Sequence, residues 1–212
     1  MTPFRLCAVT DVSARPGLSH AAAAAGALAG GAPCIQLRAK GLPPEALLRE
    51  ARAIRAATRA ASALLIVNDR LDVALAAEAD GVHLGQDDLP AARARRLLPP
   101  GRLLGVSTHD VAQARRAVAD GADYIGVGPV FATATKDTGY APLGLACLSA
   151  IAAAVPVPVV AIGGIGPAEA ADAIRAGAMA VAVISALMAA PDIAAATRAL
   201  VCRLAAEGLQ LP

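Results

Sequence analysis

Residues Gly121 to Val127 read GADYIGV, and similar stretches recur as GAPCIQL from Gly31, ADGVHL from Ala79 and GAMAVAV from Gly177. In each stretch, a turn of glycine, alanine and aspartate leads out of an expected helix into a short apolar run. Glycine after a helix supplies a left-handed C-cap. A short apolar run without alternation is typical of a strand that is covered on both faces. The repeat therefore predicts a succession of helix–strand units.

Eight such units extend along the chain. Expected strands cover 5–9, 34–37, 64–67, 81–84, 103–106, 124–127, 157–161 and 180–184. Expected helices cover 19–29, 44–60, 71–79, 90–97, 110–120, 144–154, 167–176 and 193–207. Eight alternating units close best as a (β/α)₈ or TIM barrel, an α/β fold. A length of 212 residues suits one such domain, so residues 1–212 are expected to form a single barrel.

Composition narrows the classes of partner. Hydrophobic residues make up 57% of the chain and aromatic residues only 2%, so alanine and leucine must fill the core and helices should pack closely. A net charge of +2 with 17% charged residues gives no broad basic field, which argues against nucleic acid and anionic membranes as partners. The four cysteines form no CxxC pair, and no signal peptide is apparent, so buried reduced thiols in a cytoplasmic protein are expected.

Two acidic motifs end the third and fourth expected strands. Residues 66–70 read IVNDR and residues 81–88 read GVHLGQDD, which places Asp69 and Asp88 after successive strands. In a parallel barrel these strand ends lie side by side on one rim, where two carboxylates repel each other unless a cation lies between them. Mg²⁺ is the usual occupant, because it binds a few carboxylates and leaves its other positions to water and substrate phosphates. We therefore expect a magnesium site at Asp69 and Asp88.

Two further motifs suit anions. Gln36, Arg38 and Lys40 alternate with period two, so their side chains point the same way if the strand persists, and they would suit a polyanion. The segment AIGGIGPAEA, residues 161–170, places a glycine pair before a helix, which lets backbone amides approach a phosphate at the usual phosphate-binding loops of this fold. Ser185 is expected to complete that cradle. A dinucleotide-binding fingerprint is a weaker interpretation, because no second strand with a terminal acid follows at the required distance.

The three histidines say less about the functional site than the acidic and basic motifs do. His20 is expected at the surface, and His83, inside an apolar strand, as a structural histidine. His109 suits a helix cap and a site residue about equally. Neither a three-histidine zinc pattern nor a GxSxG nucleophile elbow is present.

Taken together, the motifs resemble those of the thiamine phosphate synthase family. The resemblance covers nearly the whole chain and rests on AVTD (8–11), IQLRAK (35–40), VNDRLDVAL (67–75), ADGVHLGQDDLP (79–90), GVSTH (105–109), GADYIGVGPVFATATK (121–136), VVAIGGI (159–165) and AVISAL (182–187). It implies a TIM barrel that uses Mg²⁺ and two small-molecule substrates, an aminopyrimidine methyl diphosphate and a hydroxyethylthiazole phosphate.

The resemblance also implies residue roles. The pyrimidine diphosphate would be bound by Gln36, Arg38, Lys40, Asn68, Ser107 and Lys136, of which Arg38, Lys40, Ser107 and Lys136 are the expected catalytic residues. Asp69 and Asp88 would hold the metal. The thiazole phosphate would be bound by Thr133, Thr135, Gly164, Ile184 and Ser185.

Two alternatives stay open on the same barrel. A thiazole tautomerase would bind a thiazole phosphate without needing the metal and diphosphate set, and a regulatory protein would bind thiamine phosphate without catalysis. The combination of Asp69, Asp88, Arg38, Lys40 and Lys136 favours the synthase. The sequence leaves open whether the chain forms a homo-oligomer.

Overall fold

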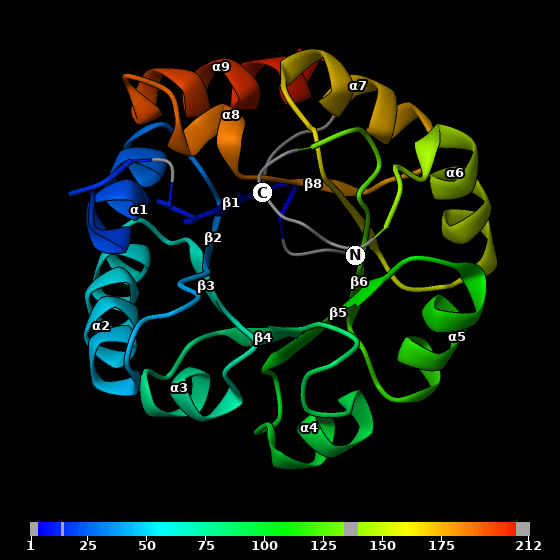
Figure 1. Ribbon diagram of the computed structural model, residues 1–212, viewed down its shortest axis with the longest axis horizontal. Helices are drawn as coiled ribbons and strands as arrows, with labels where there is room; N and C mark the ends of the chain where they lie inside the picture. Colours follow the sequence, from blue (N-terminus) through cyan, green and yellow to red (C-terminus); the bar gives the residue numbers. More distant parts are fainter. Residues whose placement is uncertain (1–3, 14, 134–139, 207–212) are drawn as a thin grey trace.

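The structure, a computed structural model, describes residues 4–13, 15–133 and 140–206. Eight parallel strands close into a barrel in sequence order, with β8 pairing back onto β1 (Figure 1). The strands are β1 Leu6–Val9, β2 Cys34–Leu37, β3 Leu64–Asn68, β4 Gly81–Leu84, β5 Leu103–Thr108, β6 Tyr124–Val127, β7 Val159–Ile162 and β8 Ala180–Val183. This confirms the barrel expected from the repeat, with every strand end within two residues of its expected position.

Helices surround the barrel (Figure 1). They are α1 His20–Ala29, α2 Pro44–Ala60, α3 Leu71–Ala76, α4 Ala91–Leu97, α5 Val111–Ala119, α6 Gly144–Ala154, α7 Pro167–Arg175, α8 Ser185–Met188 and α9 Ile193–Ala206. The short α8 was not expected, because its four residues are too few for a helical periodicity to be read from sequence. Helix α3 ends earlier than expected, and Glu78 beyond it adopts a left-handed conformation with φ 52°.

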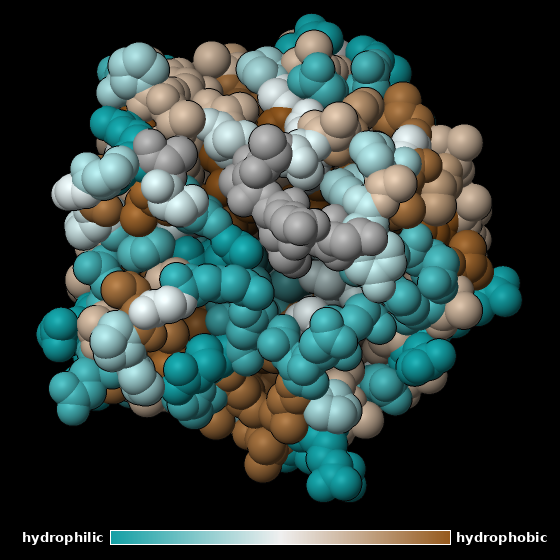
Figure 2. Space-filling model, viewed as in Figure 1, coloured by the Kyte–Doolittle hydropathy of each residue, from teal (hydrophilic) through white to brown (hydrophobic). Residues whose placement is uncertain are grey.

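Helix α2 illustrates why these segments are helical. Pro44 stands at its first position, where the missing N–H costs no hydrogen bond. Leu47, Ala51, Ile54 and Thr58 are its buried residues, and their spacing of three or four residues places them on one face. The remaining positions carry most of the polar side chains of the helix. On the face drawn in Figure 2, hydrophilic residues gather below the centre and to either side of it. The helix is therefore held mainly by packing its apolar face onto the barrel.

The core has two layers because successive strand residues point to opposite faces. Outward-facing residues such as Leu6, Leu65 and Leu104 pack against the helices. A second cluster fills the barrel interior and contains Phe4, Cys7, Val9, Cys34, Ile66, Tyr124, Val160, Ala180 and Ala182. Small residues allow close packing, as expected: a Cβ on Gly30, which caps α1, would lie only 2.5 Å from the carbonyl oxygen of Ala194 in α9.

The aspartates of the repeat tie neighbouring strands together. Asp80, before β4, accepts a hydrogen bond of 2.8 Å from the Leu65 amide in β3 and pairs with Arg55 at 2.5 Å. Asp123, before β6, accepts one of 2.7 Å from the Leu104 amide in β5. Both carboxylates lie before the strands begin, at the barrel end opposite the acidic motifs. The recurring acid in ADG and GAD is therefore structural.

The burial of His20 and of two cysteines differs from the expectation. The expected surface position of His20 is wrong: the residue is only 8% exposed, and its Nδ1 contacts Thr10, which follows β1. All four cysteines are free thiols; Cys7 and Cys34 are buried, but Cys147 is half-buried and Cys202 exposed, which corrects the expectation for these two. Over the described part of the chain, no helix has the length and apolar character needed to cross a membrane.

Candidate active site

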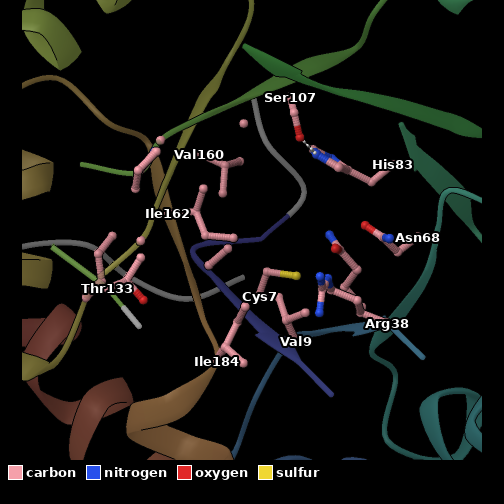
Figure 3. A pocket seen from close by; sticks show the side chains of 18 of the residues that line it. Cys7, Val9, Arg38, Asn68, His83, Ser107, Thr133, Val160, Ile162 and Ile184 are labelled. Atoms are coloured by element: carbon pink, nitrogen blue, oxygen red, sulfur yellow. Dashed lines mark hydrogen bonds between the residues drawn. The ribbon is translucent and has the colours of Figure 1, made fainter. Parts of the chain in front are cut away.

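One pocket opens at the carboxyl ends of the strands, and strand alternation decides its character. On β2 to β5, the last inward-facing residues are polar: Gln36, Asn68, His83 and Ser107. On the other four strands, the corresponding residues are small or apolar: Gly126, Ile162, Ala182 and Val9. Figure 3 shows Arg38, Asn68, His83 and Ser107 on one side, opposite Val160, Ile162 and Thr133. The pocket therefore has a polar half and an apolar half.

Asp69 and Asp88 meet beside the polar half, where Asp69 follows Asn68 and lines an adjoining depression. The pKa of Asp69 is raised to about 6, first by burial and then by a hydrogen bond to Asp88 and by the charge of Asp88. Lys40 and Arg38 are close enough to oppose that shift. Two carboxyl groups that share one partly buried position favour a bound proton or a cation.

The backbone holds both acids in place. Asp69 has φ 62°, a left-handed conformation that aspartate and asparagine tolerate better than most residues, and its amide donates to the His83 carbonyl at 2.8 Å. Asp88 folds back onto its own loop and accepts a hydrogen bond of 2.6 Å from the Gly85 amide. The carboxylates are thus positioned by β3, β4 and the loops that follow them.

These two acids fit a hard divalent cation. Mg²⁺ binds through one or two carboxylates and keeps waters or substrate phosphates at its other positions. Among residues 4–13, 15–133 and 140–206, no three histidine, cysteine, aspartate or glutamate side chains cluster so that they could hold a metal ion.

Arg38 makes an ion pair that the sequence did not predict. Its guanidinium donates to the carboxylate of Asp11, which follows β1, and the side chains are only 12% and 10% exposed. Asp11 also accepts a hydrogen bond of 3.1 Å from the Ser13 amide. The available signal was the polar ending of the AVTD motif after a buried strand. Asp11 therefore orients Arg38 where that side chain lines the pocket.

Lys40 departs from the expected common direction. Strand β2 ends at Leu37, so the alternation that would align Gln36, Arg38 and Lys40 does not reach the lysine. Gln36 and Arg38 line the pocket, whereas Lys40 lines an adjoining depression with Asn68 and Asp69. Its Nζ lies 3.8 Å from an Asp69 carboxylate oxygen. The lysine is therefore at the rim, next to the acidic pair.

Two histidines line the pocket. His83 is buried, as expected, but its ring also faces the site, where Nε2 lies 2.9 Å from the Ser107 hydroxyl oxygen. His109 lines the pocket with Nδ1 2.6 Å from the Gly128 carbonyl oxygen, and its ring stacks on Tyr140 with centroids 3.7 Å apart. Asp110 caps α5 instead of His109, by accepting from the Gln113 amide at 2.8 Å. Sequence reasoning missed the site position of His83 because an apolar strand gives no sign of which face is the interior.

The glycine pair lies where expected, but its surroundings differ from the expectation. Gly163 and Gly164 have φ 98° and 66° and line the pocket. A Cβ on Gly164 would lie 2.4 Å from the Ala132 carbonyl oxygen and 2.8 Å from the Phe131 Cβ. Packing against the neighbouring segment that contains Phe131 and Ala132 is therefore enough to require glycine at position 164, whether or not a phosphate binds there.

The other expected thiazole-side residues divide into two groups. Thr133, Ile184 and Ser185 line the same pocket as Gly164. Thr135 and Lys136 lie outside the described residues.

Comparisons with known proteins agree on one family. Residues 6–187 match the family described as thiamine monophosphate synthase. The thiamine-phosphate synthase of Chloroflexus aurantiacus is 53% identical over 93% of this chain and 91% of the relative, and that of Methanoculleus marisnigri is 55% identical over 96% of both. The solved structure of a thiamine phosphate pyrophosphorylase from Pyrococcus furiosus is 37% identical, covers 97% of each chain and superposes with a TM-score of 0.88.

Proposed function

The chain belongs to the thiamine monophosphate synthase family, and from this premise we propose how its pocket carries out the reaction. Its activity is that of a thiamine-phosphate synthase. The enzyme joins 4-amino-2-methyl-5-(diphosphooxymethyl)pyrimidine to 4-methyl-5-(2-phosphooxyethyl)thiazole and releases thiamine phosphate and diphosphate. Two substrates with three phosphoryl groups between them must therefore fit at one barrel mouth.

One observation decides where each substrate is placed in the pocket: a pair of acidic side chains lies next to two basic side chains. Asp69 and Asp88 contact each other beside the polar half, where the charges of Arg38 and Lys40 act on Asp69 and the Lys40 Nζ lies 3.8 Å from its carboxylate. We assign this half to the diphosphate of the pyrimidine substrate, because a highly charged group requires cations around it. Gln36, Asn68 and Ser107 line the same half and supply uncharged polar groups for the substrate.

Mg²⁺ held by Asp69 and Asp88 would supply positive charge to the leaving diphosphate. The geometry supports this role because the paired acids are partly buried and repel one another. Arg38 and Lys40 add charge from the protein, and the sequence motif assigns the same task to Lys136. Arg38 keeps its direction through Asp11, so it need not be ordered when substrate binds.

The bond changes require no protein nucleophile. The C–O bond between the pyrimidine methylene and diphosphate breaks, the electron-rich aminopyrimidine ring stabilises the resulting cation, and the thiazole nitrogen forms the new C–N bond. This dissociative course suits the pocket, where catalysis would come from charge stabilisation at the leaving group and from positioning. The apolar half, with Val9, Val160 and Ile162, would pack against the rings and exclude water from the cation.

We assign the thiazole phosphate to the opposite side of the mouth. Thr133, Gly164, Ile184 and Ser185 line that side, and the motif adds Thr135. Separate ends for the two anions keep their charges apart while the reacting atoms meet between them. The proposed partners are these small molecules, and the four free cysteines suit the cytoplasm as the proposed location.

A matched pair of variants tests the metal assignment. Thiamine phosphate and diphosphate are measured after incubation of both substrates with Mg²⁺. Asp88→Asn should abolish turnover, whereas Asp87→Asn, which removes the exposed neighbouring carboxylate, should retain it. Full activity of Asp88→Asn, or of the wild type in excess chelator, would contradict the magnesium role.

A further inference from the structure

A buried chain of side chains connects the barrel interior to the polar half of the pocket. The Tyr124 hydroxyl oxygen lies 3.2 Å from Nδ1 of His83, and Nε2 of the same ring lies 2.9 Å from the Ser107 hydroxyl oxygen. Tyr124 is 2% exposed and His83 9% exposed, whereas Ser107 is half-buried. Figure 3 shows His83 and Ser107 in contact at the edge of the pocket. The direction of these hydrogen bonds decides what Ser107 can offer to a ligand.

The tyrosine sets that direction. A buried hydroxyl proton needs an acceptor. Within the described part of the chain, Nδ1 of His83 is the only hydrogen-bonding partner of the Tyr124 hydroxyl. Burial holds the pKa of Tyr124 well above its usual value, so the phenol keeps its proton. Tyr124 therefore donates, and Nδ1 of His83 accepts.

The remaining hydrogen bonds follow from the chemistry of imidazole. A neutral ring with an accepting Nδ1 carries its proton on Nε2. Nε2–H then donates to the Ser107 oxygen, and the serine's own proton is left for the pocket. In the reverse arrangement, Ser107 would donate to His83 and present only lone pairs to an anionic substrate.

We propose that Tyr124 is a positioning residue that fixes the Nε2–H tautomer of His83 and thereby aims the Ser107 hydroxyl proton at the substrate diphosphate. The choice of diphosphate as the ligand rests on the proposed function, whereas the assignment of the His83 tautomer does not.

The surrounding strands leave room for this chain of hydrogen bonds. A Cβ at Gly105 would lie 2.2 Å from Cζ of Tyr124 and 2.5 Å from Nδ1 of His83. A Cβ at Gly126 would lie 3.0 Å from Cε1 of His83. Two inward-facing positions, Gly105 and Gly126, thus lack side chains. The rings of Tyr124 and His83 fill the space that side chains there would take. A role confined to filling space would not require Tyr124 to carry a hydroxyl group.

The direct test reads the tautomer without any substrate. The chain has three histidines, so nitrogen NMR of histidine-labelled protein, with His83→Gln used for assignment, resolves the His83 ring. At pH 7 we expect the neutral Nε2–H form in the wild type. Tyr124→Phe should convert it to a mixture or to the Nδ1–H form. Tyr140→Phe removes the chain's other phenol hydroxyl and should leave the His83 resonances unchanged.

Kinetics then ask whether Tyr124 acts through Ser107. Ser107→Ala should lower kcat/KM for the pyrimidine diphosphate about 10- to 100-fold, as expected for a lost hydrogen bond to a charged group. Tyr124→Phe should lower it about 2- to 10-fold, as expected for a lost neutral hydrogen bond. In the Ser107→Ala background, the tyrosine substitution should cost less than about twofold, because the group it orients is gone.

Each readout can overturn the proposal independently. A wild-type His83 in the Nδ1–H or doubly protonated form excludes the proposed direction, even if Tyr124→Phe does not fold. Equal costs of Tyr124→Phe with and without Ser107 would show that the tyrosine acts elsewhere. Absence of thiamine phosphate formation by the wild type would refute the proposed function while leaving the NMR result to stand alone.

Discussion

The Arg38–Asp11 pair gives a quantitative prediction. Asp11→Asn removes the carboxylate charge but keeps an oxygen that can accept from the Ser13 amide. Arg38 then loses its ion-pair partner at a position where its side chain is only 12% exposed. Breaking one side of a buried pair costs about 3–5 kcal/mol of unfolding free energy. Because Asp69 also interacts with Arg38, we expect the lower end, about 3 kcal/mol.

Thermal unfolding without substrate or metal measures this loss. A chain of 212 residues shifts its Tm by about 2–4 °C per kcal/mol, so Asp11→Asn should unfold about 6–12 °C below the wild type. Asp172→Ala is the control, because it breaks an ion pair to Arg175 whose side chains are 49% and 56% exposed. Such surface pairs contribute about 0–1 kcal/mol, so the control should change Tm by less than about 4 °C.

A second substitution shows whether the loss of stability comes from an unpaired buried charge or from disturbed packing. Arg38→Met in the Asp11→Asn background should recover most of the lost stability, because removing both charges of a buried pair is often neutral. If Asp11→Asn matches the control, or if Arg38→Met adds its own loss on top, then the pair does not bury charge in the way the geometry indicates.

Three further outcomes are expected. Asp69→Asn places asparagine, which also tolerates the left-handed backbone, at this position and should abolish turnover. It should raise the Tm of metal-free protein, because it removes one of two like charges, and a lower Tm would contradict this. Lys136→Ala should lower kcat about 10²–10³-fold, the range for a lost charge-stabilising donor, and an unchanged kcat with an altered KM would exclude that role. Gly164→Val should raise KM for both substrates, because its Cβ would displace Phe131 and Ala132; a selective rise for the thiazole phosphate alone would instead support a direct phosphate contact.

Much of the fold was accessible from sequence because its signals are local and repeated. Left-handed glycines at Gly31, Gly121 and Gly177 follow helices where the repeat placed them, and the strands that come next, β2, β6 and β8, are short and buried at every position. The position of Asp69 beside Asp88 also followed from topology alone, since parallel strands bring their ends to one rim. The structure adds the contact between the two acids and the burial around them.

The parts that sequence reasoning missed depend on side-chain direction. The Asp11–Arg38 ion pair joins residues from the ends of β1 and β2, and no local pattern encodes that contact. His83 is indistinguishable by composition from a core histidine until the interior face of β4 is known. Gly164 was correctly placed on the rim, but only the structure reveals that the nearby Phe131 and Ala132 also leave no room for a side chain there.

The absence of a side chain at Gly105 has an evolutionary consequence. The ring of Tyr124 occupies space that a side chain at position 105 would otherwise fill, so the two positions share one volume across neighbouring strands. Related chains should therefore inherit them as a pair. A relative with alanine or a larger residue at the place of Gly105 should carry a smaller residue at the place of Tyr124. Such a lineage would lose the phenol and would need another way to orient its histidine.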